Sequence, residues 1–180
     1  MLYRLGRMLS LPWRLVLARV FPVRYAKVIG VNLKGDVTIY GSALNMFSAE
    51  PYMVTLGNNV FISVGVRFVC HDGSTLPFRK HYPSLDIAAP IIVGDNVFIG
   101  AGALILKGVA IGNDCIVGAN SVVTKDVPSG HIVAGNPAKI IKTTAEWLES
   151  ARLRSLEIGH LHGEKKHREY KRIFGVGKTT

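Results

Sequence analysis

The strongest constraint on the fold of this chain is a repeat with a period of six residues. From Val93 onward an aliphatic residue, usually followed by glycine, opens every sixth position: Val93, Ile99, Ile105, Ile111, Val117 and Val123. Four residues after each opening stands a small or β-branched residue: Val97, Ala103, Val109, Cys115, Ser121 and Val127. The same phase appears earlier at Leu56, Ile62 and Phe68. A period of six fits neither an α-helix nor simple strand alternation.

Short strands separated by turns satisfy this period if the chain winds into stacked, three-sided coils, with one repeat on each side. The pairs expected to stack are Val93 with Ile111, Ile99 with Val117, and Ile105 with Val123. Aliphatic openings then point into the prism, and small residues fill its corners. Turns that need tight or positive-φ backbone are expected at Gly94, Gly100, Gly112 and Gly118. Such a solenoid needs several repeats to bury a core, and the six successive repeats disfavour the alternative, a glycine-rich β-sandwich.

Composition is compatible with one globular domain, since 48% of the 180 residues are hydrophobic. Two cysteines, Cys70 and Cys115, cannot build a disulfide framework and suit a reducing compartment. No uninterrupted apolar stretch reaches the roughly 18 residues of a membrane-spanning helix. We therefore expect a cytoplasmic protein, one that could be peripheral to the inner membrane.

The net charge of +10 is concentrated at the two ends of the chain. Seven basic residues precede the first acidic residue, Asp36, whereas residues 35–143 carry seven basic and seven acidic side chains. Basic ends are compatible with nucleic acid, an anionic membrane or a polyanionic small molecule. No zinc-finger spacing or aromatic–basic RNA signature accompanies the charge, so no nucleic-acid partner is expected.

Residues 1–34 form a basic amphipathic segment. One helical face carries Leu2, Leu5, Leu9, Trp13, Val16 and Val20, and the opposite side carries Arg4, Arg7 and Arg14. Positive charge beside an apolar stripe predicts a peripheral membrane contact through residues 1–24. The alternative is that this face packs against the prism or against a second copy of the chain.

Residues 143–180 are expected to lie outside the prism, which occupies residues 35–142. Thr143 and Glu146 have the spacing of a capping box that opens a helix, and Gly159 is expected to stop that helix after about Ile158. The basic sequence beyond it is expected to be mobile.

The repeat is interrupted once. After Phe68 the period predicts the next opening six residues later, at Ser74, but the regular series of openings begins at Val93, 25 residues after Phe68, so 19 residues are inserted. The difference is an insertion, expected as a loop at about residues 70–90. This loop contains His71, Asp72, Arg79, Lys80 and His81. Long loops on a rigid scaffold are frequent carriers of function.

Two stretches carry a resemblance to a known family: VGDNVFIGAGALILKGVAIGNDCIVGANSVVTKDVPSGHIVAGNPAKIIK and, before it, SAEPYMVTLGNNVFISVGVRFVCHDGS. The chain resembles the hexapeptide-repeat acyltransferases, most of all the branch of xenobiotic, galactoside, maltose and polysaccharide O-acetyltransferases. The resemblance implies an all-β fold, a left-handed parallel β-helix with an extended loop and short N- and C-terminal helices. It also implies a homotrimer. The left-handed winding comes from the resemblance alone, because parallel crossovers are otherwise nearly always right-handed.

The resemblance also assigns catalytic residues. His71 takes the position of the base that deprotonates the acceptor while acetyl-CoA and acceptor are bound together. Asp72, the next residue in the chain, is a candidate to orient its ring, with an Asx turn as the alternative role. Glu50 is a candidate to contact either the histidine or the acceptor, with a solvated turn glutamate as the alternative. A rival mechanism uses the Cys70 thiolate as nucleophile, but nothing in the sequence lowers its pKa.

Further residues are assigned to the ligands. Acetyl-CoA is expected in a groove between subunits, against Phe98, Gly102, Ala119, Lys125, Asn136, Lys139 and Lys142. The acceptor is expected at Asn45, Arg79 and Lys80. Zinc-dependent γ-class carbonic anhydrases share this prism, but His71, His81 and His131 do not supply their ligand spacing, so no metal is expected.

The resulting expectation is an acetyl-CoA-dependent O-acetyltransferase acting on a saccharide hydroxyl in polysaccharide or glycan biosynthesis. An N-acetyltransferase for sugar amines, an antibiotic acetyltransferase and a non-catalytic trimeric scaffold are the alternatives.

Overall fold

The computed structural model describes residues 11–176, which form two compact units that divide after Thr144. The first unit holds the repeats and the second begins at Ala145; each is described by itself. No helix among residues 11–176 combines the length and the apolarity needed to cross a bilayer.

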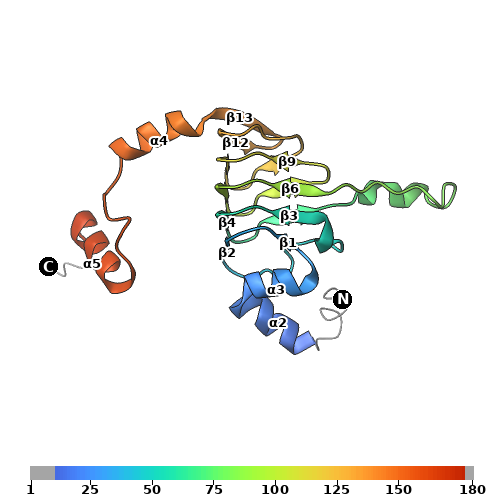
Figure 1. The fold of residues 1–180 in the computed structure, drawn as a ribbon, viewed down its shortest axis with the longest axis horizontal. Coiled ribbons are helices and arrows are strands. Elements are labelled where there is room, and N and C mark those ends of the chain that lie inside the picture. Colours follow the sequence, from blue (N-terminus) through green and yellow to red (C-terminus); the bar gives the residue numbers. More distant parts are fainter. Residues whose placement is uncertain (1–10, 177–180) are drawn as a thin grey trace. The chain divides into compact units, whose positions relative to one another are not determined.

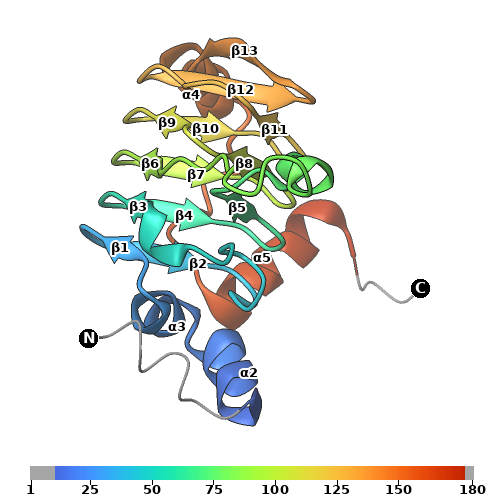
Figure 2. The ribbon, with the colours of Figure 1, turned by 90° about the vertical axis from the view of Figure 1, so that its right-hand side faces the viewer.

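Short parallel strands stack into the three faces of a prism (Figures 1 and 2). The first sheet contains β1 (Asn32–Leu33), β3 (Val54–Leu56), β6 (Ile91–Val93) and β9 (Ala110–Ile111). The second contains β2 (Val37–Ile39), β4 (Val60–Ile62), β7 (Val97–Ile99), β10 (Ile116–Val117), β12 (His131–Gly135) and the antiparallel β13 (Ala138–Thr143). The third contains β5 (Arg67–Val69), β8 (Leu104–Leu106) and β11 (Val122–Val123). The first coil thus begins at Asn32, slightly before the expected boundary at residue 35.

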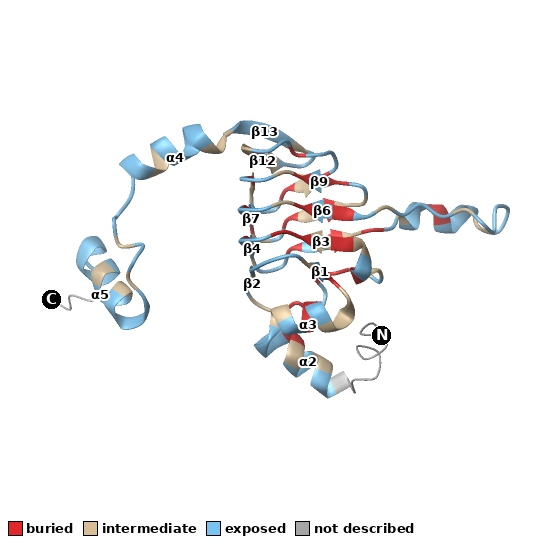
Figure 3. Cartoon of the chain, in the orientation of Figure 1, coloured by how far each residue is buried: buried red, intermediate tan, exposed pale blue. Residues whose placement is uncertain are grey.

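The expected stacking register is confirmed. Val93 pairs with Ile111, Ile99 with Val117, and Ile105 with Val123. All of these openings are buried, as are the small residues four positions after each of them. Figure 3 shows the buried residues lying inside the stacked coils. At the lower end, the rings of Phe47 and Phe68 stack with their centroids 5.4 Å apart.

The interruption of the repeat is a loop that leaves the prism. Phe98 pairs with Ile116, so three repeats of chain separate these two partners. In the coil below, Val60 pairs with Val97, and the stretch of chain between these partners is about twice as long. The extra length is the insertion expected between Phe68 and Val93. It projects from the corner between the third and first sheets and includes the 3₁₀ helix η2 (Gly73–Phe78) (Figure 1).

The glycines of the repeat serve close approach between coils. Of the two alternatives expected for Gly94, Gly100, Gly112 and Gly118, tight backbone or positive φ, positive φ is not observed. Positive φ angles in the coils occur instead at Asn59, Asn96, Asp114 and Asn120 and at Gly65, Gly102 and Gly108. A Cβ added at Gly100 would lie 2.6 Å from the amide nitrogen of Ala119 in the next coil. Asparagine and aspartate tolerate positive φ better than other residues with a side chain.

Polar side chains connect the coils at the corner between the first and second sheets. Asp95 accepts a hydrogen bond from the amide of Asn58, and Asn113 accepts one from the amide of Asp95. The side-chain amide of Asn59 donates to Asn96, and that of Asn96 donates to Asp114. These ladders satisfy turn amides that the strands leave unpaired.

Two helices precede the prism: α2 (Leu11–Val20) and α3 (Pro22–Ile29). Ala18, Tyr25 and Ala26 are buried, and Leu17 packs against the core. Trp13, Val16 and Val20 are exposed, so within the described residues the predicted apolar face is not the one that packs on the prism. Leu2, Leu5 and Leu9 lie outside the described residues. The 3₁₀ helix η1 (Pro51–Met53) precedes β3.

The second unit is helical. Helix α4 (Thr144–Leu153) begins directly after Thr143 but ends before the expected Ile158. Residues expected to be a mobile tail form helix α5 (Gly163–Phe174), closed by Gly175 with φ of 65°. Charged residues with high helical propensity fill this segment and favour the helix.

We expect Gly100→Ala to lower the free energy of unfolding by about 1–3 kcal/mol, because the new methyl group would collide with the backbone of the next coil. Urea denaturation measures this change. Gly73→Ala is the matched control: its methyl group would meet only Leu76 Cδ1, at 4.0 Å, and should change stability by less than about 0.5 kcal/mol. Equal losses in the two variants would contradict the close-approach explanation.

Candidate active site

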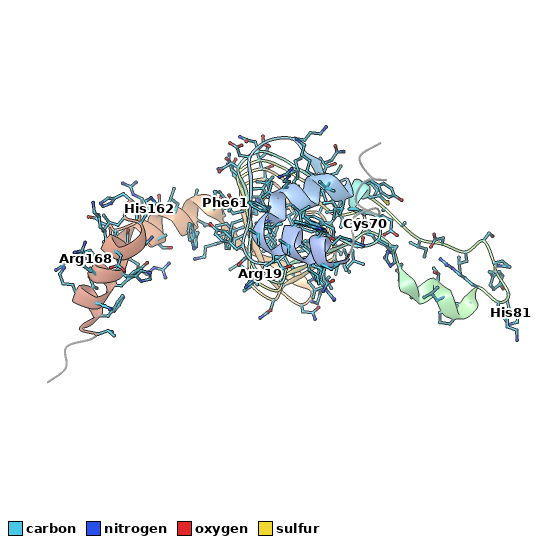
Figure 4. The ribbon with its side chains drawn as sticks, turned by 90° about the horizontal axis from the view of Figure 1, so that it is seen from below. Arg19, Phe61, Cys70, His81, His162 and Arg168 are labelled. Carbon is cyan, nitrogen blue, oxygen red and sulfur yellow. The ribbon has the colours of Figure 1, made fainter. Side chains whose placement is uncertain are left out.

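His71 lies where the chain leaves the prism. It follows β5 and begins the loop, whose two ends are paired: His71 bridges Ala88, the amide of Asp72 donates to the Ile87 carbonyl at 2.8 Å, and the amide of Ala89 donates to the Cys70 carbonyl at 2.9 Å. Figure 4 shows Cys70 at the root of this loop and His81 at its far end. The paired root fixes the backbone of His71 to the rigid coils.

Glu50 reaches His71 from the coil below. The segment 45–50 runs beside β5: the Phe68 amide donates to the Met46 carbonyl at 2.8 Å, and the Ser48 amide donates to the Phe68 carbonyl at 3.1 Å. This parallel alignment places Glu50 next to His71, with Glu50 Oε2 at 2.8 Å from His71 Nδ1. Of the two candidates to orient the imidazole, the structure brings Glu50 to it.

Ser48 completes this arrangement. Its hydroxyl donates to Glu50 Oε2 at 3.2 Å and accepts the Cys70 amide at 3.3 Å. The hydroxyl therefore connects the carboxylate to the backbone next to His71. Ser48 was not among the predicted site residues, because serine before a turn glutamate is a common turn residue and only the pairing of the segment with β5 shows its role.

The tautomer of the neutral imidazole follows from its partner. An ionised carboxylate only accepts hydrogen bonds, so Nδ1 of His71 must be the donor. In the neutral ring Nε2 is then unprotonated and can accept a proton. The His71 side chain is 43% exposed, so the ring is accessible to an acceptor. This is the arrangement required of a general base.

Asp72 does not orient the imidazole. Its Oδ2 lies 2.6 Å from Nζ of Lys107, and its Oδ1 accepts the Ser74 amide at 3.0 Å. The ammonium of Lys107, with help from Ser74, holds the pKa of this carboxyl well below its ordinary range. Asp72 opens the loop with an Asx turn and ties it to the coil above, because Lys107 directly follows β8.

Lys107 is a second residue that sequence analysis missed. The third sheet gives it the register position of Cys70 in the coil below and of Lys125 in the coil above. Its nearness to the start of the insertion, one coil away in this register, is the signal that could have identified it.

Neither cysteine has the properties of a nucleophile. Both are fully buried. Burial raises the pKa of the Cys70 thiol; a hydrogen bond with Ser48 opposes this, and the Glu50 charge adds to it. The Cys115 thiol donates to the carbonyls of Asn113 and Pro128, and burial raises its pKa as well. A thiol that is protonated and inaccessible cannot attack a thioester.

The proposed acceptor residues are dispersed. The Arg79 guanidinium is used within the loop, donating to Asp86 Oδ1 at 2.6 Å and to the Leu85 carbonyl at 3.0 Å. Lys80 is exposed beside His81 at the far end of the loop, away from its root (Figure 4). Asn45 is exposed at the start of the segment that ends at Glu50. Of these three residues, only Asn45 lies on the segment that pairs with β5 and carries Glu50, the partner of His71.

The proposed cofactor residues occupy several sides of one protomer. Phe98 is 42% exposed on the outer face of the second sheet. Gly102 and Ala119 lie at the corner between the second and third sheets, and the Gly102 amide already donates to the Val64 carbonyl at 2.9 Å. The other four candidates are exposed. Lys125 follows β11 in the third sheet, and the β12–β13 hairpin carries Asn136, Lys139 and Lys142. A single protomer does not bring this set together. Among residues 11–176, no three His, Cys, Asp or Glu side chains are placed to hold a metal ion.

We expect Lys107→Met to release the loop root, with faster hydrogen exchange of the amides of residues 72–89. Lys125→Met, in the same register one coil above, is the matched control and should leave these amides unchanged. The folded Asp72 pKa is lowered, so the stabilisation by this pair is present above the ordinary aspartate value of about 3.9 and is lost as pH falls from there toward the lower folded pKa. Wild-type loop protection should therefore decrease below about pH 4, and a loop insensitive to both substitution and acid would contradict this anchor.

The sequence is similar to those of known proteins. The family description "Hexapeptide repeat of succinyl-transferase" matches residues 90–125. The chain is 49% identical to Protein CapG of Staphylococcus aureus over 115 residues, which are 64% of this chain and 67% of CapG. It is 54% identical over 65 residues to 2,3,4,5-tetrahydropyridine-2,6-dicarboxylate N-acetyltransferase of Staphylococcus carnosus, covering 36% of this chain and 27% of that enzyme.

A solved structure has the same fold. It is a hexapeptide-repeat acetyltransferase from Vibrio cholerae, which superposes with a TM-score of 0.59 and 23% identity over 79% of this chain and 90% of that one. The prism with parallel sheets and the six-residue period are shared with this neighbour. Together with the identity to CapG over two thirds of its length, they show that the chain belongs to the hexapeptide-repeat acetyltransferase family.

Proposed function

We propose that this protein transfers the acetyl group of acetyl-CoA to a saccharide hydroxyl in polysaccharide or glycan biosynthesis. The observation that carries the proposal is the 2.8 Å contact between Glu50 Oε2 and His71 Nδ1, which leaves Nε2 as the base. Glu50 and His71 both belong to the stretch SAEPY…CHDGS, which resembles saccharide-modifying members of the family. The saccharide acceptor rests on that resemblance.

The proposed transfer is direct. Nε2 of His71 takes the proton of the acceptor hydroxyl while the oxygen attacks the thioester carbonyl carbon. Glu50 stabilises the imidazolium that forms. A backbone N–H of a neighbouring coil stabilises the tetrahedral oxyanion. The carbon–sulfur bond then breaks, and the CoA thiolate leaves and takes the proton from Nε2.

The proposed site for acetyl-CoA lies between protomers of a homotrimer. The candidate residues Phe98, Gly102 and Lys125 lie on different sides of one prism, so a groove that uses all of them needs surfaces from two copies. Exposed lysines around the β12–β13 hairpin supply charges for the phosphates of CoA.

N-acetylation of a sugar amine is the second candidate. The 54% identity to an N-acetyltransferase over 65 residues favours it. A neutral imidazole serves as base for either acceptor. Matched pairs of hydroxyl and amino sugars as acceptors distinguish the two reactions.

A peripheral membrane contact through the N-terminal helices is part of the proposal. Trp13, Val16 and Val20 fall on one face of α2 and are exposed, and Arg19 and Arg24 are exposed nearby in the sequence. Apolar side chains beside basic ones match an anionic lipid surface.

His71→Ala should lower kcat by about 10²–10⁴-fold, because the reaction loses its general base. Glu50→Gln should lower kcat by on the order of 10²-fold, because an amide can favour the wrong tautomer. Cys70→Ala is the matched control and should retain activity. Thiol release from acetyl-CoA with candidate acceptors measures all three. Direct transfer would be rejected if His71→Ala kept full activity. It would also be rejected if a folded Cys70→Ala protein lost its activity.

The membrane contact is tested by flotation with liposomes containing phosphatidylglycerol. Trp13→Ser combined with Val16→Ser should reduce the bound fraction several-fold, because both side chains are exposed on the proposed contact face. Ile87→Ser, an exposed apolar residue of the loop, is the control and should not change binding. Unchanged flotation of the double variant would refute this contact.

A further inference from the structure

A hollow of about 310 Å³ lies at the lower end of the prism, outside the contacts described for His71. Three parts of the first unit form it: α2, the turn before Phe47, and the corner that leads into β5. Its polar lining consists of Arg19, Ser42, Asn45 and Arg67, and its apolar floor includes Met46 and Val66. Figure 4 shows Arg19 on the helices beneath the prism.

Two uncompensated guanidinium groups line this hollow. Neither the Arg19 nor the Arg67 guanidinium forms an ion pair or hydrogen bond with another residue of the range 11–176, and no carboxylate lines the hollow. Both arginines are exposed. Nearby, Asn45 offers an amide, and the Ser42 hydroxyl, which accepts the Leu44 amide at 3.3 Å, retains its own proton for donation. These are the groups that bind an oxyanion.

The hollow and the catalytic pair lie at opposite ends of the same two neighbouring strands. Arg67 opens β5 and His71 follows it, and the alternation along the strand leaves Phe68 and Cys70 buried and Arg67 and His71 exposed. The segment beside it runs in parallel from Asn45 at the hollow to Glu50 at the imidazole. The strand from Arg67 to His71 spans about 13 Å.

We propose that this hollow binds a phosphate group of the acceptor saccharide, so that a hydroxyl of the same molecule reaches Nε2 of His71. The inference rests on the proposed function and deepens it by naming the class of acceptor: a saccharide attached to phosphate, whether as a sugar nucleotide or as a lipid-linked sugar. Two planar guanidinium forks match the charge and the several oxygens of a phosphate better than they match a single carboxylate.

Isothermal titration calorimetry with pyrophosphate, UDP-glucose, micellar polyprenyl-phosphate glucose and glucuronate tests the subsite. Pyrophosphate should bind to the wild-type protein, and so should one of the two sugar ligands. Both should bind at least tenfold more weakly to Arg67→Gln and to Arg19→Gln/Arg67→Gln. Arg67→Lys should keep part of the affinity because it keeps the charge. Arg24→Gln, an exposed arginine on α3 outside the hollow, is the matched control and should bind as wild type. Circular dichroism verifies that each variant is folded.

The two sugar ligands distinguish the sources: arginine-dependent binding of UDP-glucose indicates a sugar nucleotide, and that of the micellar ligand indicates a lipid-linked sugar. No binding of any phosphate ligand, equal affinity in wild type and the double variant, or binding of glucuronate alone would overturn the proposal. His71→Ala separates this inference from the proposed function, since it should bind pyrophosphate like wild type while its kcat for acetyl transfer falls by about 10²–10⁴-fold. Transfer without phosphate binding rejects the subsite alone, and phosphate binding without transfer rejects the acetyltransferase reaction alone.

Discussion

The close stacking of one coil on the next determines where every functional group of this protein lies. Backbone hydrogen bonds connect each coil to its neighbour, and glycines such as Gly100 allow the chains to approach where a Cβ would collide. Buried aliphatic side chains repeat this register along the prism. Because each strand pairs with the strand of the next coil, a residue that leaves a coil does so at a fixed height and corner. The loop at residues 70–90 therefore starts from a rigid support.

The same stacking assembles the proposed catalytic pair from residues distant in the sequence. Glu50 and His71 belong to different coils, yet the parallel pairing of their segments leaves their side chains 2.8 Å apart. Ser48 attaches the carboxylate to the backbone of Cys70, and Lys107 attaches Asp72 to the next coil. The hydrogen bond with Glu50 thus fixes the imidazole from the coil below, and the ion pair of Lys107 with the neighbouring Asp72 fixes its backbone from the coil above. A base held in this way needs little reorganisation before it accepts a proton.

Much of the fold could be predicted because the six-residue period fixes which residues stack. The period predicted the pairing of Val93 with Ile111 and the size of the insertion, and the family resemblance drew attention to His71. The sequence could not distinguish Glu50 from Asp72 as the partner of the imidazole, because that choice depends on strand pairing in the irregular coil before Leu56. Lys107 and Ser48 were missed since their roles arise from contacts between coils. Helix α5 was missed because its charged sequence carries no apolar repeat.

The position of the proton on the neutral His71 ring tests the central claim most directly. The claim is that the stacking of the coils places Glu50 where it determines the tautomer of this imidazole. Long-range proton–nitrogen correlation NMR on uniformly ¹⁵N-labelled protein distinguishes the two neutral tautomers, and the spectrum of His71→Ala identifies the signals of this ring. The account predicts a neutral ring with the proton on Nδ1 and none on Nε2. A ring with its proton on Nε2 would contradict it.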